Sequence, residues 1–178
     1  MRTLVLLAAS CMVLAGQTAR PSRPEIAAME KALDQKFARF DLDRPIEVLG
    51  LTRGLYIDGF GVVFTAEINL STGPGLSPFR PALSREDIAR LREQKLKRLP
   101  QVRELMRDML LAAAQSLDRL PPGEQIVLGV LLFSQPWEDA SGLPRLIQMQ
   151  ARRDALLEVA LQRQPRSVLA QVVRAREE

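Results

Sequence analysis

The segment from residue 56 to residue 70, YIDGFGVVFTAEINL, predicts a β-hairpin. Asp58-Gly59 supplies the positive φ angles that a tight turn between antiparallel strands requires. In the strand after the turn, every second residue from Val62 to Leu70 is apolar, while the residues between them are mostly polar. Successive side chains of a strand point to opposite faces, so one face of this strand is expected in a core and the other in water or against another part of the molecule.

The strand before the turn is expected to cover residues 46–57. It contains Gly50 and Gly54, which favour either a bulge or close approach of another backbone, or simply a loosened edge strand.

One helix is expected on each side of the hairpin. Ser22 with Glu25, and Ser84 with Asp87, have the spacing of residues that satisfy the free backbone N–H groups at a helix start. The first helix carries one apolar stripe and ends before Pro45. The second is predicted to run to about residue 119, with a break or kink at Pro100.

The two halves of the second helix differ in character. Its second half has apolar residues at helical spacing, including Met106 and Met109, which are interpreted as core residues. Its first half, residues 85–98, is rich in Arg and Lys with acids among them, and a solvated face is favoured there over a binding surface.

The C-terminal third predicts more strands. Residues 125–133, QIVLGVLLF, are nearly all apolar and indicate a central strand buried on both faces. Residues 146–151 alternate and favour a strand that pairs back on it, although Pro144 could equally open a helix. A helix is expected from about 152 to 161, and residues 167–175 are compatible with strand or helix, with strand slightly favoured.

This order predicts an α+β fold in one domain, residues 22–178. Two antiparallel β-hairpins flank a long helix (α-ββ-α-ββ-α), and the helices are expected on one face of an antiparallel sheet.

The N-terminus is typical of a secretory signal peptide. Met1-Arg2 precedes an uncharged apolar run, residues 3–15, which is shorter than the ~20 residues of a membrane-spanning helix. Cleavage is expected after Ala15, or as late as residue 19, and the chain is therefore predicted to be periplasmic or secreted. A buried N-terminal helix and a lipoprotein modified at Cys11 are less favoured alternatives.

Composition excludes several kinds of chemistry. The 178 residues contain no histidine, and the one cysteine, Cys11, lies in the segment predicted to be removed. Histidine-dependent triads, histidine-ligated metals, disulfides and thiolate nucleophiles are therefore not expected. No phosphate-binding loop, EF-hand or dinucleotide motif occurs, so no cofactor and no metal are predicted. The 25 basic and 21 acidic residues form no long run of one sign, which argues against a nucleic-acid partner.

Two loops carry the candidate binding residues. Phe79 and Arg80 lie in residues 71–83, a Ser-, Gly- and Pro-rich loop long enough to suggest a contact site, although Phe79 could equally fill the core. Trp137, Glu138 and Asp139 form the second group. Their favoured interpretation is structural, with the indole on the core and the acids capping the next turn, and a ligand or calcium contact is the alternative.

Three segments carry a resemblance to known proteins: residues 56–65 (YIDGFGVVFT), 77–81 (SPFRP) and 137–144 (WEDASGLP). They are similar to motifs of a family of uncharacterised secreted bacterial proteins. The resemblance implies bacterial export and a single domain, and it brings no known activity.

These observations favour a non-enzymatic module of the cell envelope that binds an as yet unidentified envelope protein. One alternative is a small carboxylate-dependent hydrolase or ligand-binding protein that uses Glu138, Asp139 and Arg80. The other is a protein held at a membrane surface by the basic helix segment, residues 85–98.

Overall fold

The computed structural model describes residues 20–71 and 83–178, and it has mixed α and β structure, as predicted. The predicted signal peptide, residues 1–15, and the candidate residues Phe79 and Arg80 lie outside the described residues. The chain forms α1 (Arg23–Ala38), β1 (Glu47–Val48), β2 (Arg53–Ile57), β3 (Gly61–Asn69), α2 (Arg85–Ser116), β4 (Gln125–Leu132), β5 (Leu146–Arg152), α3 (Arg153–Ala160), the 3-10 helix η1 (Arg166–Val168), α4 (Leu169–Val172) and β6 (Arg174–Glu177).

Both predicted helix starts are confirmed. The Ser22 hydroxyl accepts a hydrogen bond from the Glu25 amide, and the Glu25 carboxylate accepts one from the Ser22 amide. Ser84 and Asp87 make the same reciprocal contacts at the start of α2. These contacts satisfy backbone donors that the first turn of a helix leaves free, and so they fix where each helix begins.

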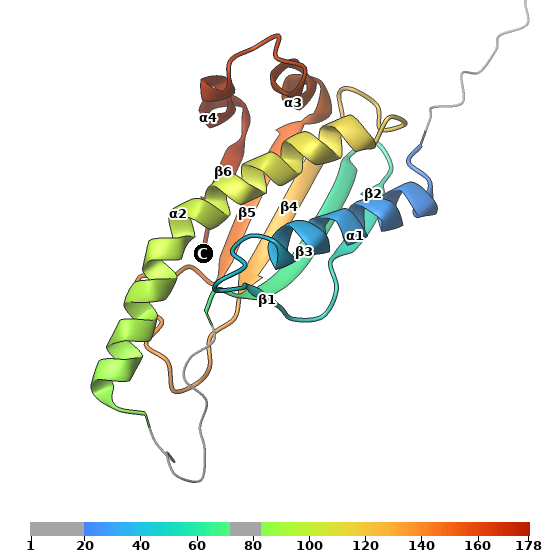
Figure 1. Ribbon diagram of the computed structural model, residues 1–178. Coiled ribbons are helices and arrows are strands. Elements are labelled where there is room, and N and C mark those ends of the chain that lie inside the picture. Colours follow the sequence, from blue (N-terminus) through green and yellow to red (C-terminus); the bar gives the residue numbers. More distant parts are fainter. Residues whose placement is uncertain (1–19, 72–82) are drawn as a thin grey trace, which may run out of the picture.

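The sheet corrects one part of the predicted fold, because it is not entirely antiparallel. β2 pairs antiparallel with β3, and β4 pairs antiparallel with β5. However, β3 and β4 are parallel neighbours, in register from Gly61 opposite Gln125 to Ile68 opposite Leu132. The long helix α2 returns the chain along the sheet, so β4 starts at the same end as β3 (Figure 1).

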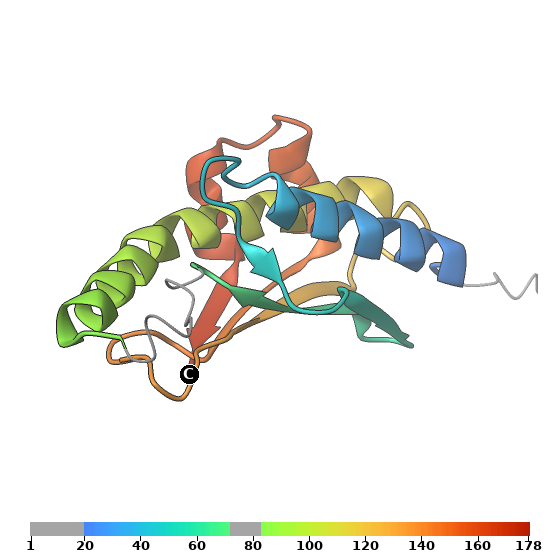
Figure 2. The same cartoon turned by 60° about the horizontal axis from the view of Figure 1, so that its bottom comes forward.

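The helices lie on one face of the sheet, as Figure 2 shows. Val62, Phe64, Ala66 and Ile68 of β3 point to this side and are buried, which confirms the predicted alternation. Met106 and Met109 of α2 have no exposed surface and are core residues, as predicted. Among residues 20–71 and 83–178, no helix lies on the opposite side of the sheet, and we call that side the open face.

The first predicted strand is wrong in its extent, since residues 46–57 form two short strands. Gly50, with φ of +85°, lies between them in a conformation that residues with a Cβ rarely adopt. Gly54 marks a close approach: a Cβ there would lie 2.6 Å from Ile26 Cγ2 and 2.7 Å from Phe64 Cε1. A glycine at this position therefore lets α1 pack directly on β2.

Side chains of α1 also form hydrogen bonds with backbone groups of β2 and of Thr52, the residue before it. Glu30 Oε1 accepts a hydrogen bond from the Gly54 amide at 2.7 Å, and Arg23 donates one to the Gly54 carbonyl at 3.2 Å. Asp34 accepts a hydrogen bond from the Thr52 amide at 3.0 Å. The edge of a sheet exposes unpaired backbone groups that can pair with another chain, and here the helix satisfies several of them.

Two further expectations are corrected in whole or in part. Of the break or kink predicted at Pro100, the break is absent, because α2 is one continuous helix from Arg85 to Ser116 with Pro100 inside it. Residues 167–175 are neither one strand nor one helix, and instead belong to η1, α4 and the start of β6. The strand predicted at 146–151 is confirmed as β5, and β4 is buried on both faces except near its end, where Leu131 is 45% exposed.

Candidate functional site

The two candidate loops start at the same edge of the sheet. Because β3 and β4 are parallel, the chain leaves both strands at neighbouring points, and the Phe133 amide donates a hydrogen bond to the Ile68 carbonyl at 2.8 Å. We call this the carboxyl edge. Ligands of sheets with parallel strands commonly bind at such an edge, so the surfaces around it are the first place to look for a site.

Glu138 is placed in the interior and not in a binding cleft. Its carboxylate forms an ion pair with Lys95 of α2, and the two side chains are only 4% and 2% exposed. The Lys95 ammonium also donates a hydrogen bond to the Phe133 carbonyl at 3.2 Å. This pair therefore ties the loop after β4 to the long helix.

Asp139 shapes the same loop from its surface. Its carboxylate accepts a hydrogen bond from the Ser141 amide at 2.9 Å and lies 3.6 Å from Arg92 of α2. The hydrogen bonds from Ser141, helped by the charge of Arg92, hold the pKa of Asp139 below its ordinary value. The predicted capping of the next turn is thus confirmed for Asp139.

Trp137 is half-buried and does not belong to the main core. Neither Glu138 nor Asp139 lines the two hollows described below. The geometry of the described residues therefore does not favour a hydrolase built on these two carboxylates, since neither is held at a cavity where a substrate could lie.

Arg98 of α2 is the second buried cation, at 8% exposure. Its guanidinium donates hydrogen bonds to the carbonyls of Leu70 and Arg44, and it lies over the ring of Phe40, 5.6 Å from the ring centre. Burial lowers the pKa of Arg98, although the nearby charge of Asp41 opposes this effect. Arg98 thereby joins the end of β3 to the loop after α1.

These two cations correct the interpretation of residues 85–98 as a solvated face. Lys95 lies four residues after Leu91 and four before Leu99, and both leucines are buried. The helical spacing of the apolar stripe that runs from Leu99 onward therefore extends back through Lys95. This spacing is the sequence signal that indicates a buried position for Lys95.

One hollow lies on the helix side of the carboxyl edge and has a basic lining. Its volume is about 380 Å³, and its cations are Arg44, Arg90, Lys97 and Arg98. Lys97 pairs with Glu93 at 2.8 Å, and Arg98 is held by main-chain carbonyls. Most of the charged side chains of this hollow are thus either exposed to solvent or already bound to other groups of the protein.

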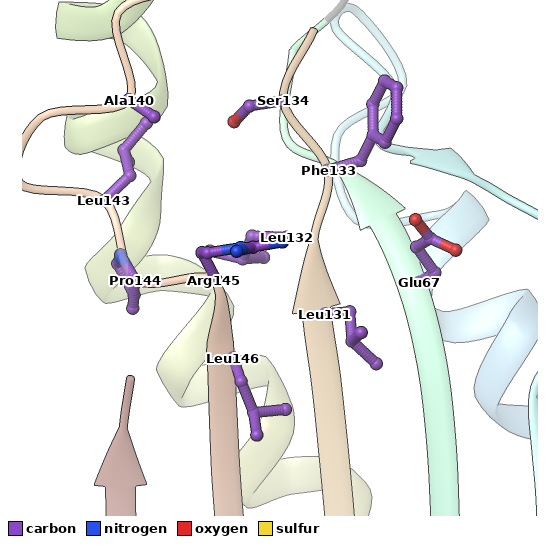
Figure 3. Close-up of a pocket in the computed structure, with 10 residues that line it drawn as sticks. All are labelled: Glu67, Leu131, Leu132, Phe133, Ser134, Ala140, Leu143, Pro144, Arg145 and Leu146. Carbon is purple, nitrogen blue, oxygen red and sulfur yellow. The ribbon is translucent and has the colours of Figure 1, made fainter. Parts of the chain in front are cut away.

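A second hollow lies where β4 ends and the chain returns to β5, with a volume of about 510 Å³. Figure 3 shows its residues: Leu131 and Leu146 lie on neighbouring strands, Glu67 lies beyond them on β3, and Arg145 reaches across the gap between β5 and β4. We call it the strand-end hollow. Its walls are mainly apolar, with Leu143, Pro144 and Phe133 completing them.

The open face next to this hollow is apolar on one side and polar on the other. Strand register places the exposed Leu55 opposite Val63, and Val63 opposite Val127. Further across the sheet, Gln150 faces Arg174 and Gln148 faces Arg176. The open face is thus a broad surface with exposed aliphatic side chains at β2 and arginines at β6.

The described residues contain no cluster of acidic or cysteine side chains suited to a metal ion. None of the helices in residues 20–71 and 83–178 is both long and apolar enough to cross a membrane. Comparison of the chain with models of protein families, with curated proteins and with solved structures gave no match. The resemblance to secreted bacterial proteins therefore stays a prediction.

Proposed function

We propose that this chain is an exported, non-enzymatic binding module of the bacterial cell envelope, and that it contacts a protein partner through the open face of its sheet. The observation that carries the proposal is that, in the part of the chain that the structure describes, the helices lie on one face of the sheet and exposed aliphatic side chains lie on the other. Leu55 is 63% exposed, Ile57 43% and Leu131 45%.

Strand composition supports this role for the open face. Sheets with parallel strands are usually covered on both faces, because their strands are apolar on both sides. Here β3 and β4 are parallel, and Val63, Val127 and Leu131 lie on the uncovered side. Leu55 and Ile57 of β2, with Val63 opposite Leu55, form the exposed apolar part of this face, and apolar patches on a folded protein commonly mark a contact with another molecule.

The position of the acidic residues supports binding over catalysis. Glu138 is held by Lys95, and Asp139 is held by the Ser141 amide. Both carboxylates thus have a structural partner. The proposed binding surface needs neither of them.

The partner surface is tested by affinity capture from an envelope extract with three tagged chains: wild type, Leu55→Glu and Leu42→Glu. Leu42 is 82% exposed and lies in the loop after α1, so the same substitution there is the matched control. We expect Leu55→Glu to lose the proteins that wild type and Leu42→Glu both retain. Identical capture by all three chains would contradict the proposal.

Export is tested separately, by producing the full chain in a bacterial host and sequencing the N-terminus of the protein recovered outside the cytoplasm. We expect it to begin after Ala15. A Leu7→Arg variant, which places a charge within the apolar run, should stay uncleaved in the cytoplasm. Recovery of full-length wild type in the cytoplasm would overturn the prediction.

A further inference from the structure

We propose that the strand-end hollow binds a short apolar peptide, two or three residues long, through its free ammonium and carboxylate groups. The inference deepens the proposed function and rests on it, since it takes the uncovered side of the sheet as a binding surface. The carboxylate of Glu67 would hold the peptide ammonium, and the guanidinium of Arg145 would hold the peptide carboxylate.

The two charged side chains are available for a ligand. Among the described residues, no ion pair or side-chain hydrogen bond is formed by Glu67 or by Arg145 (Figure 3). Many other arginines of the chain have such partners, as Arg103 has in Glu177 and Arg92 in Asp139. The strand-end hollow thus brings together an acid and a base that are both free to bind a ligand.

The spacing of these charges sets the length of the ligand. Glu67 lies opposite Leu131, and Leu131 lies opposite Leu146, the residue after Arg145. Two strand spacings separate these backbones by about 10 Å, since neighbouring strands are ~4.8 Å apart. The Arg145 side chain extends toward β4 (Figure 3), so this backbone separation is an upper bound on the span between the two charges. An extended peptide covers at most about 3.5 Å per residue, so two or three residues bridge the two charges.

The lining of the hollow sets the character of the side chains. Leu131 and Leu146 present aliphatic surface beside the two charged side chains, and Leu143 and Pro144 extend the apolar lining on the far side of Arg145 (Figure 3). The volume of about 510 Å³ lies within the range of ordinary ligand sites. Aliphatic peptide side chains would remove this surface from water, while the termini keep charged partners.

Other ligands fit this pattern less well. A simple anion would satisfy Arg145 and leave Glu67 facing it with the same sign of charge. A simple cation would satisfy Glu67 alone, with no second acid in the lining. A ligand with opposite charges at its two ends satisfies both.

The test is calorimetric titration of the folded chain with the tripeptide Ala-Leu-Leu, its N-acetylated form and its C-amidated form, at low salt. We expect the free peptide to bind and each blocked form to bind at least about tenfold more weakly. Triglycine, which has both termini and no aliphatic side chains, should also bind more weakly than Ala-Leu-Leu.

Variants assign each terminus to its residue. Glu67→Gln should weaken binding of the free peptide without further weakening that of the acetylated peptide, and Arg145→Gln should do the same for the amidated peptide. Glu86→Gln and Arg39→Gln make the same changes of charge at exposed positions of α2 and at the end of α1, away from the hollow and the open face, and should bind as wild type does.

Absence of binding at millimolar peptide, or equal binding of free and blocked peptides, would overturn this inference. Equal affinity of Glu67→Gln, Arg145→Gln and wild type would overturn it as well. Failure here leaves the capture experiment with Leu55→Glu untouched, because Leu55 lies on β2 and outside the strand-end hollow. The two proposals can therefore fail separately.

Discussion

Lys95 and Glu138, which are 43 residues apart in the sequence, form an ion pair whose side chains are 2% and 4% exposed. Removing two charges from water is costly, and their mutual attraction repays this only when the geometry and the remaining hydrogen bonds are good. Here the ammonium has a second acceptor in the Phe133 carbonyl. The pair fixes the loop after β4 on α2 and leaves a large penalty if either partner is removed.

We therefore expect Lys95→Met and Glu138→Leu each to lower the free energy of unfolding by about 3–5 kcal/mol, because each leaves one buried charge alone. The double variant should recover most of this loss. The exposed pair of Lys97 and Glu93 is the control, and breaking it should cost less than about 1 kcal/mol. Urea unfolding measures the free energy of unfolding of each variant. If the double variant lost the sum of the two single losses, the two side chains would not be acting as a pair.

Arg98 should not be replaceable by lysine. Its planar guanidinium serves the carbonyls of Leu70 and Arg44 together while it lies on the Phe40 ring. An ammonium cannot reproduce this geometry, so Arg98→Lys is expected to cost about 1–3 kcal/mol in unfolding experiments. Arg90→Lys on the exposed side of α2 should change stability little, and a similar loss in both variants would speak against the assigned contacts.

Glu30 makes stability depend on acid pH. Burial raises the pKa of its carboxyl, but hydrogen bonds from Arg23 and the Gly54 amide, together with the charges of Arg23 and Arg53, outweigh burial and place the pKa below its ordinary value of 4.5. The ionised form thus favours the folded state. Its contribution is complete above the unfolded value and is lost as the pH falls through the folded pKa.

The corresponding measurement is unfolding by urea at a series of acidic pH values. Glu30→Gln should be less stable than wild type near neutral pH, and the difference should shrink as the pH falls below 4.5. Lys31→Gln, on the exposed side of α1, should keep the pH dependence of wild type. A constant difference between Glu30→Gln and wild type at every pH would refute the role of this ionisation.

Gly54 is expected to tolerate no side chain. An added Cβ meets Ile26 Cγ2 at 2.6 Å, so Gly54→Ala must displace α1 from β2 and should cost about 1–3 kcal/mol. Gly123→Ala is the matched control, because the nearest atom to its Cβ is Arg152 Nη2 at 3.9 Å. Thermal unfolding compares them, and equal melting temperatures would rule out the close packing.

Local pattern predicted much of this structure. The alternation from Val62 to Leu70, the capping residues Ser22 and Ser84, and the apolar stripe around Met106 each depend on neighbours along the chain. The order of strands in the sheet does not depend on such local neighbours. Alternation tells which face of β4 is buried, but it does not tell which strand lies beside β4. The parallel pairing of β3 with β4 therefore escaped prediction.

The candidate site was harder to predict for a related reason. The sequence marks Glu138 as a candidate because it is a carboxylate, but its environment depends on Lys95, which belongs to another element. The sequence predicts a solvated position for Lys95, because charged residues are seldom buried without a partner and the partner of Lys95 is not visible in the local sequence. Glu67 and Arg145 come together only through the register of three strands.

The position of β4 between β3 and β5 also governs how the chain can assemble. The strands of the first half, up to Asn69, have no partner on that side until residues 125–132 have been made. Pairing between such distant segments is slow to form, and unpaired strands are prone to associate with other chains in the meantime. We therefore expect neither half of the chain to fold on its own, and we expect newly made chains to be open to association with one another until the second half is complete.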